Sequence, residues 1–112
     1  RNILELLIRL KKEGRNIAAY GAPAKGSILL NYCGIREDFL DYAVDRNPVK
    51  QGLFIPGTRV PIFPPERVFE TRPDYLLLLP WNLEGEIRRQ MDGVREWGGQ
   101  FIVPIPKPRI LP

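Results

Sequence analysis

The chain has 112 residues, of which 44% are hydrophobic and 27% are charged, and its formal net charge at pH 7 is +4. With no histidine and a single cysteine, it excludes an internal disulfide and a Ser-His-Asp triad and argues against a zinc site. No apolar run is long enough to cross a membrane, and no signal peptide is visible. We therefore expect a globular protein of a reducing compartment, the cytoplasm.

The positive charge favours an anionic ligand, such as a phosphate group, or an acidic partner surface. Nucleic acid is not expected, because the 17 basic residues are scattered and form no dense basic run. The alternative is a mildly basic surface without a specific ligand. Because a helical pattern starts almost at Arg1, without a methionine, we expect an excised piece of a longer protein.

In chain order, apolar spacing and turn residues predict helices that alternate with strands. A first helix is capped by Asn2, with Glu5 placed as in a capping box, and Gly14 follows its end. Later helices are expected over residues 27–33, 64–69 and 83–97. The expected strands are residues 16–20, 41–45, 60–63, 74–79 and 100–103.

Alternating strands and helices predict a parallel sheet with helices on both faces, because crossovers between parallel strands are right-handed. We expect a Rossmann-like three-layer α/β/α domain over residues 1–112, with about five strands in the order 3-2-1-4-5. In that order the crossovers of strands one and four leave in opposite directions and open a crevice at their carboxyl ends. The proline-rich tail, residues 104–112, is expected to lie extended on the surface.

The loop after the first strand is the first candidate site. A strand, a glycine-bounded loop and a helix N-terminus form a natural seat for an anion. Compared with the dinucleotide fingerprint G-x-G-x-x-G, the chain has the first and last glycines, Gly21 and Gly26. Pro23 replaces the middle glycine, which disfavours NAD or FAD. A P-loop fails as well, because Lys25 precedes the second glycine. Two alternatives stay open: a plain strand-to-helix turn, or a phosphate seat made by the N–H groups of Lys25, Gly26 and Ser27.

The turn after the second strand faces the same crevice. Asp45 follows Gly21 at close to the roughly 20 residues at which an acidic residue meets a ribose hydroxyl in dinucleotide-binding folds. Arg46 and Lys50 would neutralise a phosphate, and Asn47 would hydrogen-bond a sugar hydroxyl. The alternative is that Asp45 only caps N–H groups of the loop.

A third candidate ends the fourth strand. Trp81 offers an aromatic face and Asn82 an amide, which together would stack on and hydrogen-bond a sugar or base. The alternative is that Trp81 only packs and Asn82 only caps the next helix.

These motifs resemble one known family. It is the C-terminal domain of the S-adenosylmethionine-dependent C-methyltransferases that act on nucleotide-linked deoxysugars. The similarity runs in order from about residue 15 to about residue 106. Its main motifs are Tyr20-Gly-Ala-Pro-Ala-Lys-Gly-Ser27, Val44-Asp-Arg-Asn-Pro48, Pro56-Gly-Thr58 and Leu79-Pro-Trp-Asn82.

The resemblance implies a whole enzyme that removes a proton beside a keto group of the sugar and transfers a methyl group to that carbon. It places zinc in an N-terminal region and S-adenosylmethionine in a central domain, both outside this chain. The upstream methyltransferase domain and a nucleotide-linked sugar are the implied partners. We thus expect this chain to be inactive alone, with no catalytic residue and no metal ligand.

By motif, the resemblance assigns substrate contacts to Gly21, Ala22, Pro23, Lys25, Gly26, Ser27, Asp45, Arg46, Asn47, Lys50, Trp81 and Asn82. Two alternatives stay open. One is an interaction domain that docks onto the upstream catalytic domain without touching the ligand. The other is a free-standing dinucleotide-binding module, against which Pro23 argues.

Overall fold

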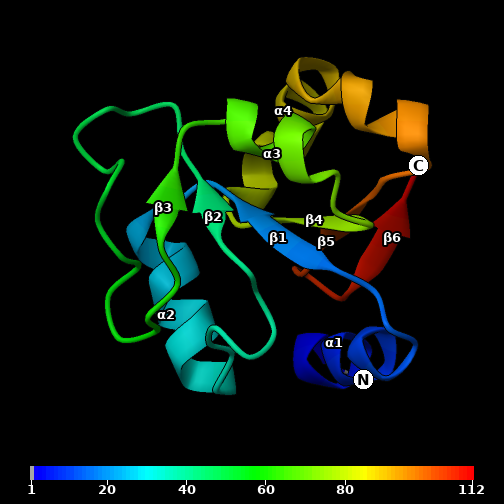
Figure 1. Ribbon diagram of the computed structural model, residues 1–112. Coiled ribbons are helices and arrows are strands. Elements are labelled where there is room, and N and C mark those ends of the chain that lie inside the picture. The colour runs from blue at the N-terminus through cyan, green and yellow to red at the C-terminus, as the bar shows by residue number, and fades with distance from the viewer. Residues whose placement is uncertain (1) are drawn as a thin grey trace.

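The computed structural model describes residues 2–112. Within them, a sheet of six strands runs through the middle of the molecule in the order β3-β2-β1-β4-β5-β6 (Figure 1). The first five are parallel, and β6 is antiparallel. The predicted α/β class and the order 3-2-1-4-5 are confirmed. The strands are β1 (Ile17–Tyr20), β2 (Ala43–Val44), β3 (Ile62–Phe63), β4 (Tyr75–Leu78), β5 (Gln100–Val103) and β6 (Arg109–Leu111).

Helices cover both faces of the sheet. In Figure 1, α1 (Ile3–Lys12) and α2 (Ala24–Cys33) lie below it, whereas α3 (Glu66–Thr71) and α4 (Glu84–Gln90) lie above it. Among residues 2–112, no helix combines the length and the apolar character that a membrane span requires.

The helix ends show what the local pattern could predict. Asn2 caps α1 as expected, its side-chain oxygen accepting the N–H of Glu5 at 3.0 Å. The helix predicted over residues 83–97 is broken, because α4 is preceded by the 3₁₀ helix η1 (Trp81–Leu83) and followed by the 3₁₀ helix η2 (Asp92–Trp97).

Two apolar clusters, one on each face, hold these layers together. Side chains alternate along each strand, so Ile17 and Ala19 face α1 and α2 while Ala18 and Tyr20 face α3 and α4. The central strand β4 splits in the same way and is buried on both faces, as predicted for a parallel strand. At roughly 1.5–3 kcal/mol for each fully buried large apolar side chain, these clusters are the main source of stability.

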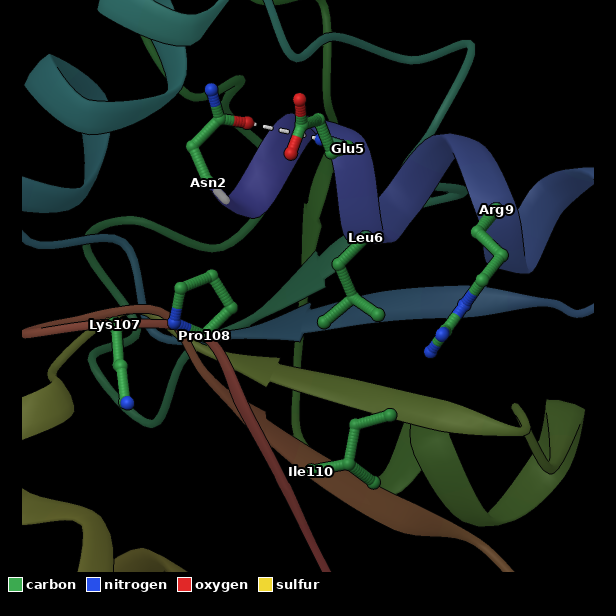
Figure 2. Close-up of a pocket in the computed structure, with 7 residues that line it drawn as sticks. All are labelled: Asn2, Glu5, Leu6, Arg9, Lys107, Pro108 and Ile110. Carbon is green, nitrogen blue, oxygen red and sulfur yellow. Dashed lines mark hydrogen bonds between the residues drawn. The ribbon is translucent and has the colours of Figure 1, made fainter.

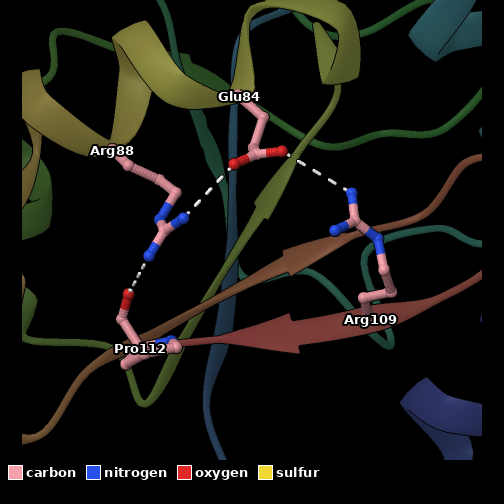
Figure 3. A network of polar contacts seen from close by, with 4 residues as sticks. All are labelled: Glu84, Arg88, Arg109 and Pro112. Atoms are coloured by element: carbon pink, nitrogen blue, oxygen red, sulfur yellow. Dashed lines mark hydrogen bonds and ion pairs between the residues drawn. The ribbon is translucent and has the colours of Figure 1, made fainter.

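The tail prediction needs a correction. The chain after Val103 is extended, but Arg109–Leu111 pairs with β5 as strand β6 instead of lying on the surface by itself. Figure 3 shows what holds its end: Glu84 lies 3.3 Å from Arg88 and 3.6 Å from Arg109, and Arg88 donates to the carbonyl of Pro112 at 2.9 Å. Exposed ion pairs contribute about 0–1 kcal/mol each, so the strand pairing supplies most of the order.

The packing of α2 on the end of β4 gives a first prediction. A Cβ added at Gly26 would lie 2.8 Å from the Cβ of Leu79, so Gly26→Ala should lower the free energy of unfolding by about 1–3 kcal/mol. Gly85→Ala is the matched control, because its Cβ would meet only the end of Arg89 at 3.9 Å and should stabilise α4 by up to about 1 kcal/mol. Urea unfolding followed by tryptophan fluorescence measures both. Equal stabilisation by the two substitutions would contradict the close contact.

Candidate functional site

The predicted crevice lies at the carboxyl ends of β1, β2 and β4. Tyr20 is in register with both Val44 and Leu78, so the three strands end at the same level. After β1 the chain crosses to α2 on one face, and after β4 it crosses to α4 on the other (Figure 1). Neighbouring crossovers that diverge in this way leave a ligand-sized opening at the sheet edge.

A hollow of about 220 Å³ occupies this position. Its walls come from three connections that follow the strands and from the inner face of α4. The lining residues are Tyr20, Gly21, Ala22, Pro23, Asp45, Arg46, Lys50, Pro80, Leu83, Glu86, Ile87 and Gln90.

Gly21 allows the loop after β1 to pack against the loop after β4. Its φ is +86°, and a Cβ there would lie 2.6 Å from Cγ of Pro80. Its N–H donates to the carbonyl of Val44 at 2.6 Å. Only glycine meets both demands, a left-handed backbone and contact with the Pro80 ring.

Most of the N–H groups predicted to bind a phosphate already form hydrogen bonds within the protein. Pro23 is the residue before α2, and its carbonyl accepts the N–H of Gly26 at 3.0 Å and of Ser27 at 3.1 Å. The helix therefore begins at Ala24, earlier than the predicted Ser27, and two of the three N–H groups expected to hold a phosphate are already bonded.

Hydrogen bonds of Asp45 connect the loop after β1 to the loop after β2. One carboxylate oxygen accepts the N–H of Ala22 and the other accepts the N–H of Asn47, each at 2.8 Å. The Nζ of Lys50 donates to the carbonyl of Ala22 at 2.7 Å, and Gln51 donates to the carbonyl of Asp45 at 2.8 Å. These bonds match the alternative in which Asp45 caps loop N–H groups.

Trp81 and Asn82 meet Lys25 beside the hollow but outside its lining. The Nζ of Lys25 lies 4.6 Å from the centre of the Trp81 ring and donates to the side-chain oxygen of Asn82. The prediction that Asn82 caps the next helix is wrong: α4 begins at Glu84, after Leu83, and takes no side-chain cap. Both Asn82 and Trp81 lie in η1.

Ser27 faces away from the hollow, toward the connection between β2 and β3. Its hydroxyl donates to the carbonyl of Pro56 at 3.3 Å, and the amide of Asn31 donates to the same carbonyl at 2.9 Å. Gly57, with a φ of +79°, lets this connection approach Asn31. The motifs around Ser27 and Pro56 thus join α2 to the long loop.

Tyr20 and α4 also line the hollow, which the sequence motifs did not predict. The Tyr20 hydroxyl donates to the side-chain oxygen of Gln90 at 3.0 Å. Burial raises the pKa of Tyr20, and the neighbouring Arg46 guanidinium opposes part of that rise, so the phenol is neutral at pH 7. The spacing of Glu86 and Gln90, one helical turn apart, is the signal that would have placed them on one face.

Among the basic side chains predicted to line the crevice, Arg46 is the one available to a ligand. Among residues 2–112, its side chain forms no hydrogen bond or ion pair, and it lies exposed at the edge of the hollow. Lys50 and Lys25, in contrast, are each held by a protein oxygen. An unpaired guanidinium is well suited to phosphate because its planar fork binds two oxygens at once.

Another hollow, of about 590 Å³, lies at the β6 edge of the sheet, between α1 and the connection before β6. Figure 2 shows Leu6 and Arg9 extending toward it from α1, with Lys107 and Ile110 on the opposite side. It lies away from the point where the crossovers diverge, and we give the crevice preference as the candidate site.

Two features of the described residues bear on the zinc and the S-adenosylmethionine that are expected in the whole enzyme. Among residues 2–112, no three His, Cys, Asp or Glu side chains gather closely enough to hold a metal ion. The loop that would hold a nucleotide cofactor presents Pro23, and both the N–H and the carbonyl of Ala22 are bonded within the protein.

Comparison with known proteins identifies the class. The chain belongs to the C-methyltransferase C-terminal domain family, which matches residues 1–106. The C-methyltransferase NovU of Streptomyces niveus is a relative that is 44% identical over 109 residues, or 97% of this chain. That match covers 26% of NovU, so the chain spans about a quarter of the length of this relative. The resemblance drawn from the motifs is confirmed at the level of the family.

The bonds of Asp45 give a second prediction. Asp45→Asn replaces one acceptor by a donor, so the N–H of Ala22 or of Asn47 loses its partner. We expect the free energy of unfolding to fall by about 1–3 kcal/mol and the amide of Ala22 to exchange with solvent faster. Native-state hydrogen exchange measures this.

The matched control is Asp38→Asn, which removes the same charge from an exposed side chain that bonds to no other described residue. Unchanged exchange at Ala22 in Asp45→Asn would contradict the role assigned to this carboxylate.

Proposed function

We propose that this chain is the substrate-side C-terminal domain of an S-adenosylmethionine-dependent C-methyltransferase that acts on a nucleotide-linked keto-deoxysugar. The observation that carries the proposal is the unpaired Arg46 at a hollow where the crossovers of the sheet diverge, in a chain of this family. An anionic nucleotide sugar suits that cation and the net charge of +4. The chain binds substrate and is inactive alone.

The chemistry takes place in the part of the enzyme outside this chain. Bound S-adenosylmethionine supplies an electrophilic methyl group there, and zinc belongs to a separate upstream region. The sugar loses a proton beside its keto group before that carbon is methylated. The residues of this chain hold and orient the nucleotide sugar, which fixes the reacting carbon in place.

The proposed contacts differ in their surroundings. The residues that line the hollow are the strongest candidates: Gly21, Ala22, Pro23, Asp45, Arg46 and Lys50. Lys25, Trp81 and Asn82 are proposed to contact the ligand from the neighbouring rim. Gly26, Ser27 and Asn47 are proposed to act by shaping the two loops.

Titration with a thymidine diphosphate keto-deoxysugar tests the proposal. We expect the amide signals of residues 21–27 and 46–50 to shift, because these loops form the crevice. Two-dimensional NMR of the 15N-labelled chain measures this. Glucose alone serves as the control ligand, and nucleotide sugar that leaves both loops unmoved would contradict the proposal.

A second candidate function is an interaction domain that docks onto the upstream catalytic domain without touching the ligand. It is favoured by large apolar side chains on α2 and on the long loop: Ile28 is 68% exposed, Tyr32 89% and Phe54 60%. Ile28 and Tyr32 lie one helical turn apart on α2, and contiguous exposed apolar residues mark protein interaction surfaces. The three quarters of the relative that lie outside the match supply the sequence for such a partner.

Lys25→Ala in the enzyme that contains this chain separates the two functions. Substrate binding by this domain predicts a higher KM for the nucleotide sugar, because the Lys25 ammonium leaves the rim of the crevice. Docking alone predicts an unchanged KM. Steady-state kinetics measures it, with Lys12→Ala, at an exposed position of α1, as the control.

A further inference from the structure

Two hollows meet at the carboxyl ends of the strands. Beside the hollow of about 220 Å³ lies a second, of about 710 Å³, which extends toward α3 and the start of η2. Tyr20, Arg46 and Gln90 line both. Drug-sized ligands bind in spaces of about 300–1,000 Å³. The smaller hollow is therefore too small for a nucleotide sugar, whereas the joined pair has room for one.

Arg46 stands at the junction of the two hollows. It is close enough to Tyr20 to oppose the rise in the pKa of that hydroxyl. Each hollow also contains one glutamate that the other lacks: Glu86 lines the smaller hollow and Glu66 lines the larger. A diphosphate group at Arg46 would therefore lie between the two hollows. The carboxylate in each hollow can accept hydrogen bonds from hydroxyl or N–H groups of the ligand.

The larger hollow contains a fixed aromatic ring. Phe69 packs edge-on against Trp97, with the ring centres 5.8 Å apart, and is 42% exposed. A Cβ at Gly93 would lie 2.8 Å from Cε1 of Phe69, so the glycine makes room for the ring. The ring is thus packed against Trp97 and still partly exposed, so it is available for stacking.

A polar side chain lines the same hollow as this ring. The amide nitrogen of Gln51 donates to the carbonyl of Asp45 at 2.8 Å, which holds the side chain in place. Its oxygen accepts no hydrogen bond from the described residues and is available for an N–H group of a ligand. An aromatic face and a fixed amide acceptor that line one hollow suit a nucleobase.

We infer that the larger hollow binds the base of the nucleotide, that Arg46 binds its diphosphate, and that the smaller hollow beside Gly21 and Pro80 receives the sugar. This orientation rests on the proposed function and adds to it the position of each part of the substrate. It also makes Phe69 and Gln51 specificity residues, although neither of them was assigned to the site from the sequence.

The test uses the 112-residue chain with inorganic pyrophosphate, thymidine diphosphate and a thymidine diphosphate sugar as probes, followed by NMR. Pyrophosphate should shift the signals around Arg46 only. Thymidine diphosphate should also shift the amide of Phe69 and the side-chain amide of Gln51. The sugar should add shifts at Gly21.

Substitutions test the base site and the diphosphate site separately. Phe69→Leu keeps an apolar side chain against Trp97 but removes the ring, and it should weaken thymidine diphosphate about tenfold while leaving pyrophosphate affinity unchanged. Phe54→Leu, on an exposed Phe outside both hollows, should change neither affinity. Arg46→Gln should weaken both probes, whereas Arg36→Gln should not.

Thymidine diphosphate that leaves Phe69 unshifted, or keeps its affinity in Phe69→Leu, overturns the base position. Pyrophosphate affinity that survives Arg46→Gln overturns the diphosphate position. In either case the proposed function stands if the nucleotide sugar still shifts residues 21–27, and it falls with the inference if those signals do not move.

Discussion

The backbone of Ala22 is held at both of its polar groups by side chains from another connection. Asp45 accepts its N–H, and Lys50 donates to its carbonyl. These two bonds join the loop after β1 to the loop after β2. Gly21 then packs against Pro80, which brings in the loop after β4. The crevice has a defined shape because these three connections fix one another.

This arrangement also decides which charges face a ligand. Asp45, Lys50 and Lys25 have the charges expected of ligand-binding residues, but each is engaged by another group of the protein. Arg46 remains unpaired among the described residues and lies where two hollows join. The crevice therefore presents an unpaired guanidinium beside charged groups that are bonded within the protein.

The fold was predictable where it depends on neighbours in the sequence. Asn2 caps α1, and the short apolar runs form β1 to β5, because local hydrogen bonds and side-chain alternation decide them. Strand β6 was not predictable, since the proline-rich tail has little strand character by itself. It forms because the edge of β5 offers backbone partners and because Arg88 holds Pro112.

The sequence by itself determined the α/β class, the strand order, the family and the position of the crevice, because these follow from periodicity, crossover handedness and motif order. Only the tertiary structure decided which groups of the protein the side chains in that crevice contact. Whether the carboxylate of Asp45 meets a ligand or the N–H of Ala22 depends on a contact between distant parts of the chain. The same holds for Phe69, Gln90 and Tyr20, which reach the crevice from elements whose packing no local pattern records.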